Sequence, residues 1–128
     1  MKKLAMVVAA SSVLLSATSL TAVANDSIAE GLCTAISADD RQRLRTILSN
    51  HNMRVRNIYT SIRCNNYSML QFAITAEAEQ VGEMLTRQLP ASVIDDDTVN
   101  GEHILSWAES TGYGSSAVVA AVRNRISD

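Results

Sequence analysis

The chain has 128 residues, of which 47% are hydrophobic, 19% charged and 4% aromatic, and its formal net charge is −2. This length allows one small domain with a modest hydrophobic core. The negative net charge and the few aromatic side chains exclude a typical nucleic-acid-binding protein, which presents a basic face with aromatic residues interleaved.

The first 24 residues are predicted to be a cleavable secretory signal peptide. Two lysines follow the initiating methionine, residues 4–20 carry no charge, and positions 22–24 read Ala-Val-Ala, a small-x-small cleavage site. The apolar run contains serine and threonine and is shorter than the roughly 20 strongly apolar residues of a membrane span. Cleavage after Ala24 would place residues 25–128 in the periplasm, and no later run is long enough to form a transmembrane segment.

Removal of the signal peptide changes the charge of the protein. Both lysines are lost, and the remaining 104 residues carry nine arginines against thirteen acids, a formal charge of −4. Residues 41–63 hold six arginines and no acid, whereas most acids lie in the later half. This asymmetry predicts a basic face for an anionic envelope partner or an acidic protein, or else two halves that attract each other or are simply solvated. The candidate contact residues of such a face are Arg41, Arg45, Arg54, Arg56 and Arg63.

Two cysteines, Cys33 and Cys64, remain in the exported chain. An even number of cysteines in an oxidising compartment favours a disulfide. A redox dithiol and a metal-binding pair are the alternatives, but the spacing is far from C-x-x-C, and His51 alone cannot complete a zinc site. The disulfide would contribute roughly 3 to 4 kcal/mol in the chain-entropy model.

Apolar side chains recur at helical spacing along most of the mature chain. Ser27 and Asp39 are the predicted N-caps of the first two helices, and Ser68 is the predicted N-cap of a later one. Residues 78–89 form a further helix that Pro90 ends. The pattern therefore predicts short helices separated by short connections.

The remaining segments carry weaker signals. Residues 51–66 predict a short helix or turn packed on the core, and residues 95–97 predict a solvated acidic loop. Asn100 and Gly101 indicate a turn, which precedes a helix that stops near residue 112. Ser115 or Ser116 is the predicted N-cap of the last helix.

A weak internal repeat runs through these helices. Residues 32–39 align with residues 70–77 at an offset of 38, and residues 105–108 align with residues 70–73 at an offset of 35. Each copy has the pattern L-x-x-A, a polar turn and then a second apolar helix. The repeat predicts three similar units, at about residues 27–52, 67–90 and 102–127.

This pattern resembles ankyrin repeats, most closely in residues 100–108 followed by Gly112 and the valine pair at 118–119. The T-P-L-H tetrapeptide of that family is absent. The first two copies also lack the turn glycine between their helices, and Ala38 and Ala76 lie near that position instead. The resemblance implies an all-α domain in which short helical hairpins stack in an ankyrin-like array.

A second resemblance involves residues 56–66 together with residues 68–73. These segments are similar to a family of short exported bacterial proteins of unknown function. The resemblance brings no activity with it.

No motif in the chain predicts a catalytic residue, a metal site or a cofactor. An EF-hand frame that begins at Asp96 places Trp107 at the twelfth position, where calcium binding needs a glutamate. His51 and His103 lie in no nucleophile or metal motif. The predicted function is therefore a protein–protein or envelope interaction module, with Tyr113, between two glycines, as a further candidate contact. A small ligand-binding protein or enzyme with a pocket near Glu102 and His103 is the alternative.

Overall fold

The computed structural model describes residues 20–127, and it describes side chains from residue 27 onward. Most of the predicted signal peptide, residues 1–19, lies outside the described residues, and the predicted cleavage site after Ala24 falls within the first helix.

In chain order the elements are α1 (Leu20–Ser37), α2 (Arg41–Asn50), α3 (Val55–Ile58), α4 (Met69–Ala76), α5 (Glu79–Gln88), α6 (Ala91–Asp95), β1 (Thr98–Val99), β2 (Glu102–His103), α7 (Ile104–Ser110) and α8 (Ala117–Ser127). The predicted all-α class is thus confirmed, apart from a sheet of two short strands. Across the described residues, no helix combines the length and apolar character needed to span a bilayer.

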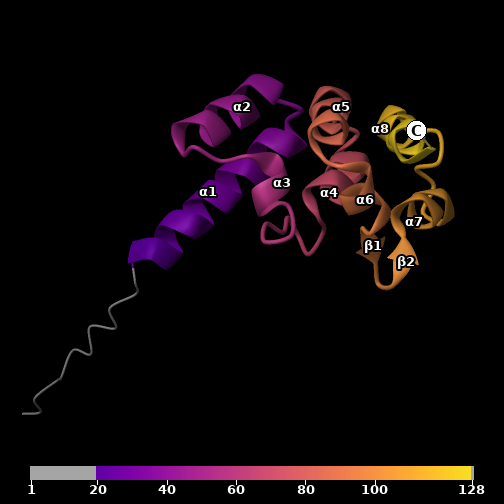
Figure 1. The fold of residues 1–128 in the computed structure, drawn as a ribbon, viewed down its shortest axis with the longest axis horizontal. Helices are drawn as coiled ribbons and strands as arrows, with labels where there is room; N and C mark the ends of the chain where they lie inside the picture. The colour runs from indigo at the N-terminus through magenta and orange to yellow at the C-terminus, as the bar shows by residue number, and fades with distance from the viewer. Residues whose placement is uncertain (1–19, 128) are drawn as a thin grey trace, which may run out of the picture.

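Three pairs of consecutive helices form hairpins that follow one another along the molecule (Figure 1). The second helices form one row, in which α2 contacts α5 and α5 contacts α8. On the other side of the core, α1 packs against α4. The short helices α3 and α6 follow the first two hairpins and contact α5 and α8, respectively. The apolar faces of all these helices enclose one continuous core.

The three hairpins share one turn geometry. Asp39, Glu77 and Gly112, which are 38 and 35 residues apart, adopt positive φ angles of 53°, 53° and 95°. The next residue in each turn donates its N–H to the carbonyl of the alanine five positions earlier, over 2.8, 2.9 and 2.7 Å. This left-handed ending satisfies carbonyls at the helix C-terminus. Only the third turn has the glycine that the geometry favours, because Cβ strains a left-handed backbone.

A tight turn precedes both α4 and α7. Asn65 and Asn66 have φ angles of 53° and 68°, and Asn100 and Gly101 have φ angles of 53° and 84°. Two successive positive φ angles are typical of the type I′ turn, whose backbone twist matches that of the two strands in a β-hairpin. Strands β1 and β2 pair on either side of the second turn, and Cys64 and Tyr67 form a single bridge around the first. The sequence predicts the turn at Asn100 and Gly101 but neither strand pairing, since two-residue strands have no readable alternation.

Several predicted helix starts need correction. The prediction of Ser27 as the first N-cap is wrong, because α1 begins at Leu20. The cap of α2 is Asp40, whose carboxylate accepts the N–H of Arg43 at 3.0 Å, rather than Asp39. The prediction for Ser68 is confirmed: its hydroxyl accepts the N–H of Gln71, and the Gln71 side chain accepts the N–H of Ser68. This reciprocal arrangement is a capping box.

Helix α5 is capped at both ends by residues of neighbouring hairpins. Its own N-cap, Ala78, has no side-chain acceptor, but Asp39 Oδ1 accepts the N–H of Val81 at 2.9 Å. At the other end, the Arg125 guanidinium of α8 donates to the carbonyl oxygen of Leu89 over 3.3 and 3.1 Å. The helix dipole favours both contacts, because the negative carboxylate lies at the N-terminus of α5 and the positive guanidinium lies at its C-terminus.

Helices α5 and α8 approach each other closely at Gly82. A Cβ atom added there would lie 2.6 Å from Cγ2 and 2.7 Å from Cγ1 of Val118, which is nearer than carbon atoms can pack. Both residues are buried. The absence of a side chain at position 82 therefore sets the spacing between the second and third hairpins.

The predicted disulfide between Cys33 and Cys64 is confirmed, with the two Cα atoms 5.6 Å apart. It joins the C-terminal part of α1 to the bridge residue before α4, and the two cysteines are 31 residues apart in the sequence. Because each sulfur is bonded to the other, neither is available as the metal ligand that sequence analysis kept as an alternative.

The left-handed turns lead to a first prediction. Replacing Glu77 with glycine should raise stability by about 1 kcal/mol, because the substitution removes Cβ strain from an exposed residue at positive φ. For a domain of this size the melting temperature should rise by roughly 4 °C or more, measured by circular dichroism. Glu79→Gly is the matched control: it lies in the first turn of α5, where glycine should lower stability. A Glu77→Gly protein that melts below the wild type would contradict the prediction.

Candidate functional site

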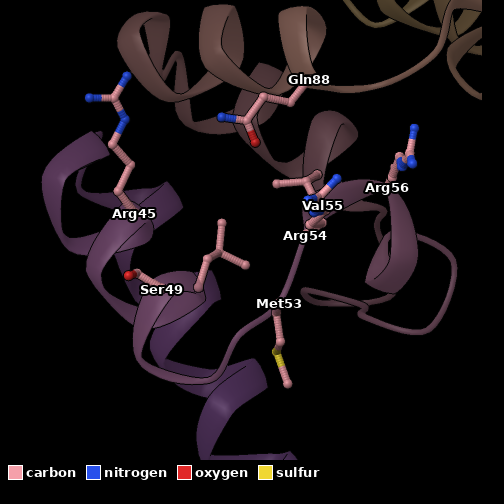
Figure 2. A pocket seen from close by; sticks show the side chains of 8 residues that line it. Arg45, Ser49, Met53, Arg54, Val55, Arg56 and Gln88 are labelled. Atoms are coloured by element: carbon pink, nitrogen blue, oxygen red, sulfur yellow. The ribbon is translucent and has the colours of Figure 1, made fainter.

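Three arginines of the acid-free segment surround one hollow in the surface. Arg45 lies on α2, while Arg54 and Arg56 lie on either side of the first residue of α3. Together with Ser49 and Gln88 they line a hollow of about 400 Å³, called here the arginine hollow. Figure 2 shows Arg45 and Arg56 on opposite sides of it, with Gln88 reaching in from α5 between them.

Local sequence explains how the arginine hollow forms. On α2, Leu44 and Leu48 are buried, which leaves Arg45 and Ser49 at a spacing of four on the exposed side. On α3, only Val55 is fully anchored in the core, so the arginines before and after it are exposed. The floor consists of the apolar side chains of Leu48, Met53 and Val55.

The arginines of this segment are not neutralised by the acidic half of the chain. From residue 27 to residue 127, the ion pairs are Glu83 with Arg87, Glu109 with Arg123, and Asp95 with His103, and none involves an arginine between residues 41 and 63. The interpretation that the two halves attract each other therefore finds no support in the described side chains. The positive charge of the arginine hollow faces solvent.

The other two predicted contact arginines lie elsewhere. Arg41, at the start of α2, is half-buried and does not line the arginine hollow. Arg63 is exposed and lines a different cavity, together with Asp96 and Asp97. The five predicted residues thus do not form one surface, because the break after α3 carries Arg63 away from the exposed side of α2.

Tyr113 packs against the protein. It is half-buried, its ring centroid lies 6.1 Å from that of Trp107, and Trp107 lies 5.6 Å from Tyr67. The three rings form a cluster that covers one side of α7. This arrangement agrees with a loop tyrosine folded back on its own helices.

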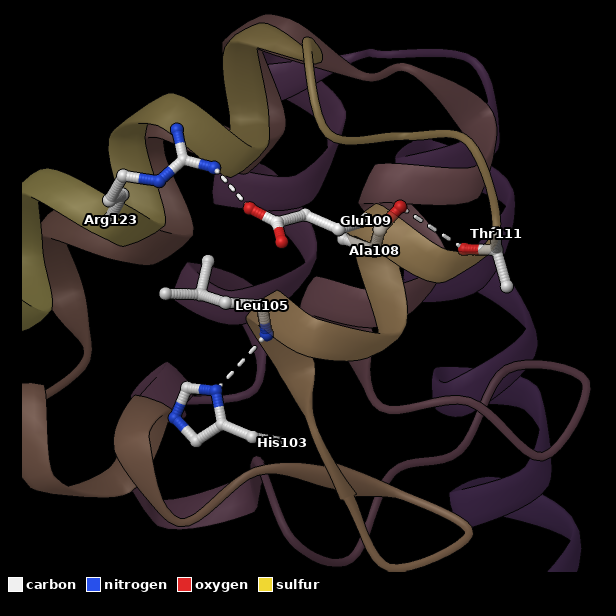
Figure 3. Close-up of polar contacts among 6 residues, drawn as sticks. All are labelled: His103, Leu105, Ala108, Glu109, Thr111 and Arg123. Carbon is white, nitrogen blue, oxygen red and sulfur yellow. Dashed lines mark hydrogen bonds and ion pairs between the residues drawn. The ribbon is translucent and has the colours of Figure 1, made fainter.

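The two ring nitrogens of His103 are both occupied. Nδ1 accepts the N–H of Leu105 at 3.2 Å, which caps α7 (Figure 3). Nε2 lies 2.8 Å from Oδ1 of Asp95 and donates to it, since Nδ1 is an acceptor. The carboxylate of Glu102 points to the Ser110 hydroxyl at 3.5 Å instead. The side chains of Glu102 and His103 therefore contact different residues.

A buried polar cluster links the segments after α3 and α6 to the start of α4, and the sequence does not predict it. Asp97 is 9% exposed, and it accepts hydrogen bonds from the Tyr59 hydroxyl at 2.5 Å, the Ser68 hydroxyl at 2.7 Å and the Gln71 amide at 2.5 Å. The prediction of a solvated acidic loop at residues 95–97 holds for Asp96, which is exposed and follows α6. Asp95 is exposed but ends α6, and the prediction is wrong for the buried Asp97. Within a run of three aspartates, nothing in the sequence distinguishes the one that turns inward.

The cluster controls the ionisation of Tyr59. Burial, together with the neighbouring Asp97 carboxylate, raises the pKa of the Tyr59 phenol far above its usual value near 10. Tyr59 therefore stays protonated and keeps donating to Asp97. No buried side-chain nitrogen or oxygen among the described residues lacks a hydrogen-bond partner, which indicates a structural role for the cluster.

Residues 27–127 hold no group of three histidine, cysteine, aspartate or glutamate side chains arranged to bind a metal ion.

The family of the chain follows from a match over residues 32–95, half of its length. The chain belongs to the family described as "Protein of unknown function (DUF3718)". The earlier resemblance to a family of unknown function is thus confirmed at that level. The matched segment includes both cysteines, the three arginines of the hollow and Tyr59, and it ends just before Asp97 and the third hairpin. No curated protein and no solved structure matches the chain.

The buried cluster generates a second prediction. Tyr59→Phe removes one donor from a buried carboxylate and should cost about 1 to 3 kcal/mol of unfolding free energy at pH 7. Because the pKa of Tyr59 is raised in the folded state, its contribution is complete below the unfolded pKa of about 10 and is lost as pH rises above that value. The stability difference between wild type and variant should therefore shrink above pH 10.

Urea unfolding followed by circular dichroism from pH 7 to pH 11 checks both parts of this prediction. Tyr113→Phe is the control at pH 7, because Tyr113 is half-buried and lies outside the Asp97 cluster, so the loss of its hydroxyl should change stability by less than about 0.5 kcal/mol. A Tyr59→Phe protein as stable as the wild type at pH 7, or a difference that stays constant to pH 11, would contradict the prediction.

Proposed function

We propose that the protein is an exported interaction module that binds an acidic protein segment in the arginine hollow, without catalysis of its own. The observation that carries this proposal is the gathering of three exposed arginines, none in an ion pair with a described residue, around one apolar floor. Guanidinium groups bind carboxylates through two parallel hydrogen bonds, which gives geometric specificity as well as attraction.

The lining of the hollow favours a protein partner over a simple anion. Arginine and methionine are enriched at protein interfaces, and the floor offers Leu48, Met53 and Val55 to an apolar side chain. Ser49 and Gln88 add hydrogen-bonding groups at the edge. An acidic segment with one apolar anchor residue matches all of these features.

The proposed architecture is an ankyrin-like stack. It is supported by three hairpins with the same left-handed turn, by the row of α2, α5 and α8, and by the tight turns before α4 and α7. Stacked hairpins present side chains from successive units on one continuous surface. In this protein the arginine hollow occupies the surface where α2 and α3 meet α5.

Export is proposed on two independent grounds. The first residues have the charge, apolar run and Ala-Val-Ala site of a signal peptide. The Cys33–Cys64 disulfide is the form that two cysteines take in an oxidising compartment.

The binding proposal is tested by removing the three charges together. Arg45→Ser, Arg54→Ser and Arg56→Ser in one variant should weaken partner binding at least tenfold, since each hydrogen bond to a charged group contributes about 1.5 to 3 kcal/mol. The measurement is quantitative crosslinking and capture from an envelope extract, which compares the proteins recovered by each variant. The stability should change little, because all three side chains are exposed.

A charge-matched variant controls for the loss of net positive charge. Arg43→Ser, Arg87→Ser and Arg123→Ser removes three exposed arginines that do not line the hollow. Proteins recovered by the wild type and by this control, but not by the hollow variant, are partners of the arginine hollow. Equal recovery by all three proteins would reject the proposal.

The export proposal makes a separate prediction about the mature protein. Protein isolated from the periplasm should begin at Asn25, and its intact mass should show no addition after treatment with a thiol alkylator unless a reductant is applied first. Uncleaved protein in the cytoplasmic fraction, or two alkylated cysteines without reduction, would contradict it.

A further inference from the structure

A second cavity lies between the segment after α3 and the segment around the end of α6. It has a volume of about 220 Å³, and its lining includes Thr60 and Arg63 on one side and Val93, Asp96 and Thr98 on the other. It is distinct from the arginine hollow and shares no lining residue with it.

The floor of this cavity is held in place. Tyr59, Ser68 and Asp97 form it, and both hydroxyls donate to the same Asp97 oxygen. The other Asp97 oxygen accepts from Gln71, which also donates to the carbonyl of Thr98 over 3.0 Å. A floor whose members bind one another is preorganised, so a ligand would not have to order it.

The rim carries two opposite charges that do not neutralise each other. Arg63 and Asp96 are both exposed and line the same cavity. Neither forms an ion pair with the other or with any side chain between residues 27 and 127. The arrangement leaves a positive group and a negative group on the lining of one cavity, each free to meet a ligand.

The size and lining restrict the ligand. The volume is below the roughly 300 Å³ at which pockets for drug-sized molecules begin, so the ligand is smaller than a drug-sized molecule. The threonine hydroxyls add hydrogen-bonding groups, and Val93 is the one aliphatic side chain in the lining.

We propose that this cavity binds a small zwitterion of the α-amino acid class. Its carboxylate would pair with the Arg63 guanidinium in a bidentate contact. Its ammonium group would lie against Asp96, on the side of the cavity where Asp97 adds a second carboxylate. A molecule that carries both charges is complementary to the rim, whereas a simple anion or cation meets only half of it.

The proposal is tested by titrating the purified protein with glycine, L-alanine and L-serine while amide chemical shifts are followed by NMR. At least one of these amino acids should produce saturable shifts at Thr60 and Thr98. Propionate and ethylamine, which each keep one charge of alanine, should bind at least tenfold more weakly. Absence of saturable shifts with all three amino acids, or propionate or ethylamine binding as tightly as alanine, would overturn the proposal.

Single substitutions at the rim locate the site. Arg63→Gln and Asp96→Asn should each weaken amino acid binding at least tenfold without changing the far-ultraviolet circular dichroism spectrum. The matched controls are Arg56→Gln, in the arginine hollow, and Asp95→Asn, next to Asp96 but directed at His103. These controls should bind as the wild type does, and unchanged affinity in either rim variant would reject the assignment.

Discussion

The Asp97 carboxylate holds together the segment after α3, the start of α4 and the segment after α6. A carboxylate removed from water must be met by donors, and here they come from Tyr59 after α3, Ser68 at the start of α4, and Gln71 one turn later. These contacts fix the approach of α6 and β1 to the second hairpin. Tyr59 also relates the two cavities: it directly follows α3, the helix between Arg54 and the break in the chain, and it forms part of the floor of the second cavity.

Much of the helical arrangement could be predicted because it depends on local chemistry. Ser68 and Gln71 have the spacing of a capping box, and the apolar faces of α2, α4 and α5 follow helical periodicity. The predicted first helix start at Ser27, by contrast, is wrong, because a serine within a helix is indistinguishable in sequence from one that begins it. Asp39 was misassigned for a related reason: two adjacent aspartates can both cap, and only the packed structure directs one of them to the N-terminus of α5.

The candidate sites were less predictable than the fold. Charge counting located the arginine-rich segment, but it could not show that Arg45, Arg54 and Arg56 gather while Arg41 and Arg63 do not. That division depends on the direction of the chain after α3. The sequence gives no sign of the second cavity, which is lined by residues from 59–68 and residues from 93–98. Only tertiary packing brings two segments so far apart in the sequence to one cavity. Tyr113 shows the opposite case, in which a loop residue between two glycines packs against an aromatic neighbour, Trp107.

The capping of α5 by its neighbours bears on how the protein unfolds. In arrays of independent repeats, the end units can fray while the rest stays folded, because each unit satisfies its own backbone. Here the N-terminus of α5 borrows an acceptor from the first hairpin and its C-terminus borrows a donor from the third. Melting of either outer hairpin would thus leave the central helix with an uncapped end. These contacts couple the three hairpins, so we expect the amides of α5 to exchange with solvent mainly through openings that disturb the whole domain.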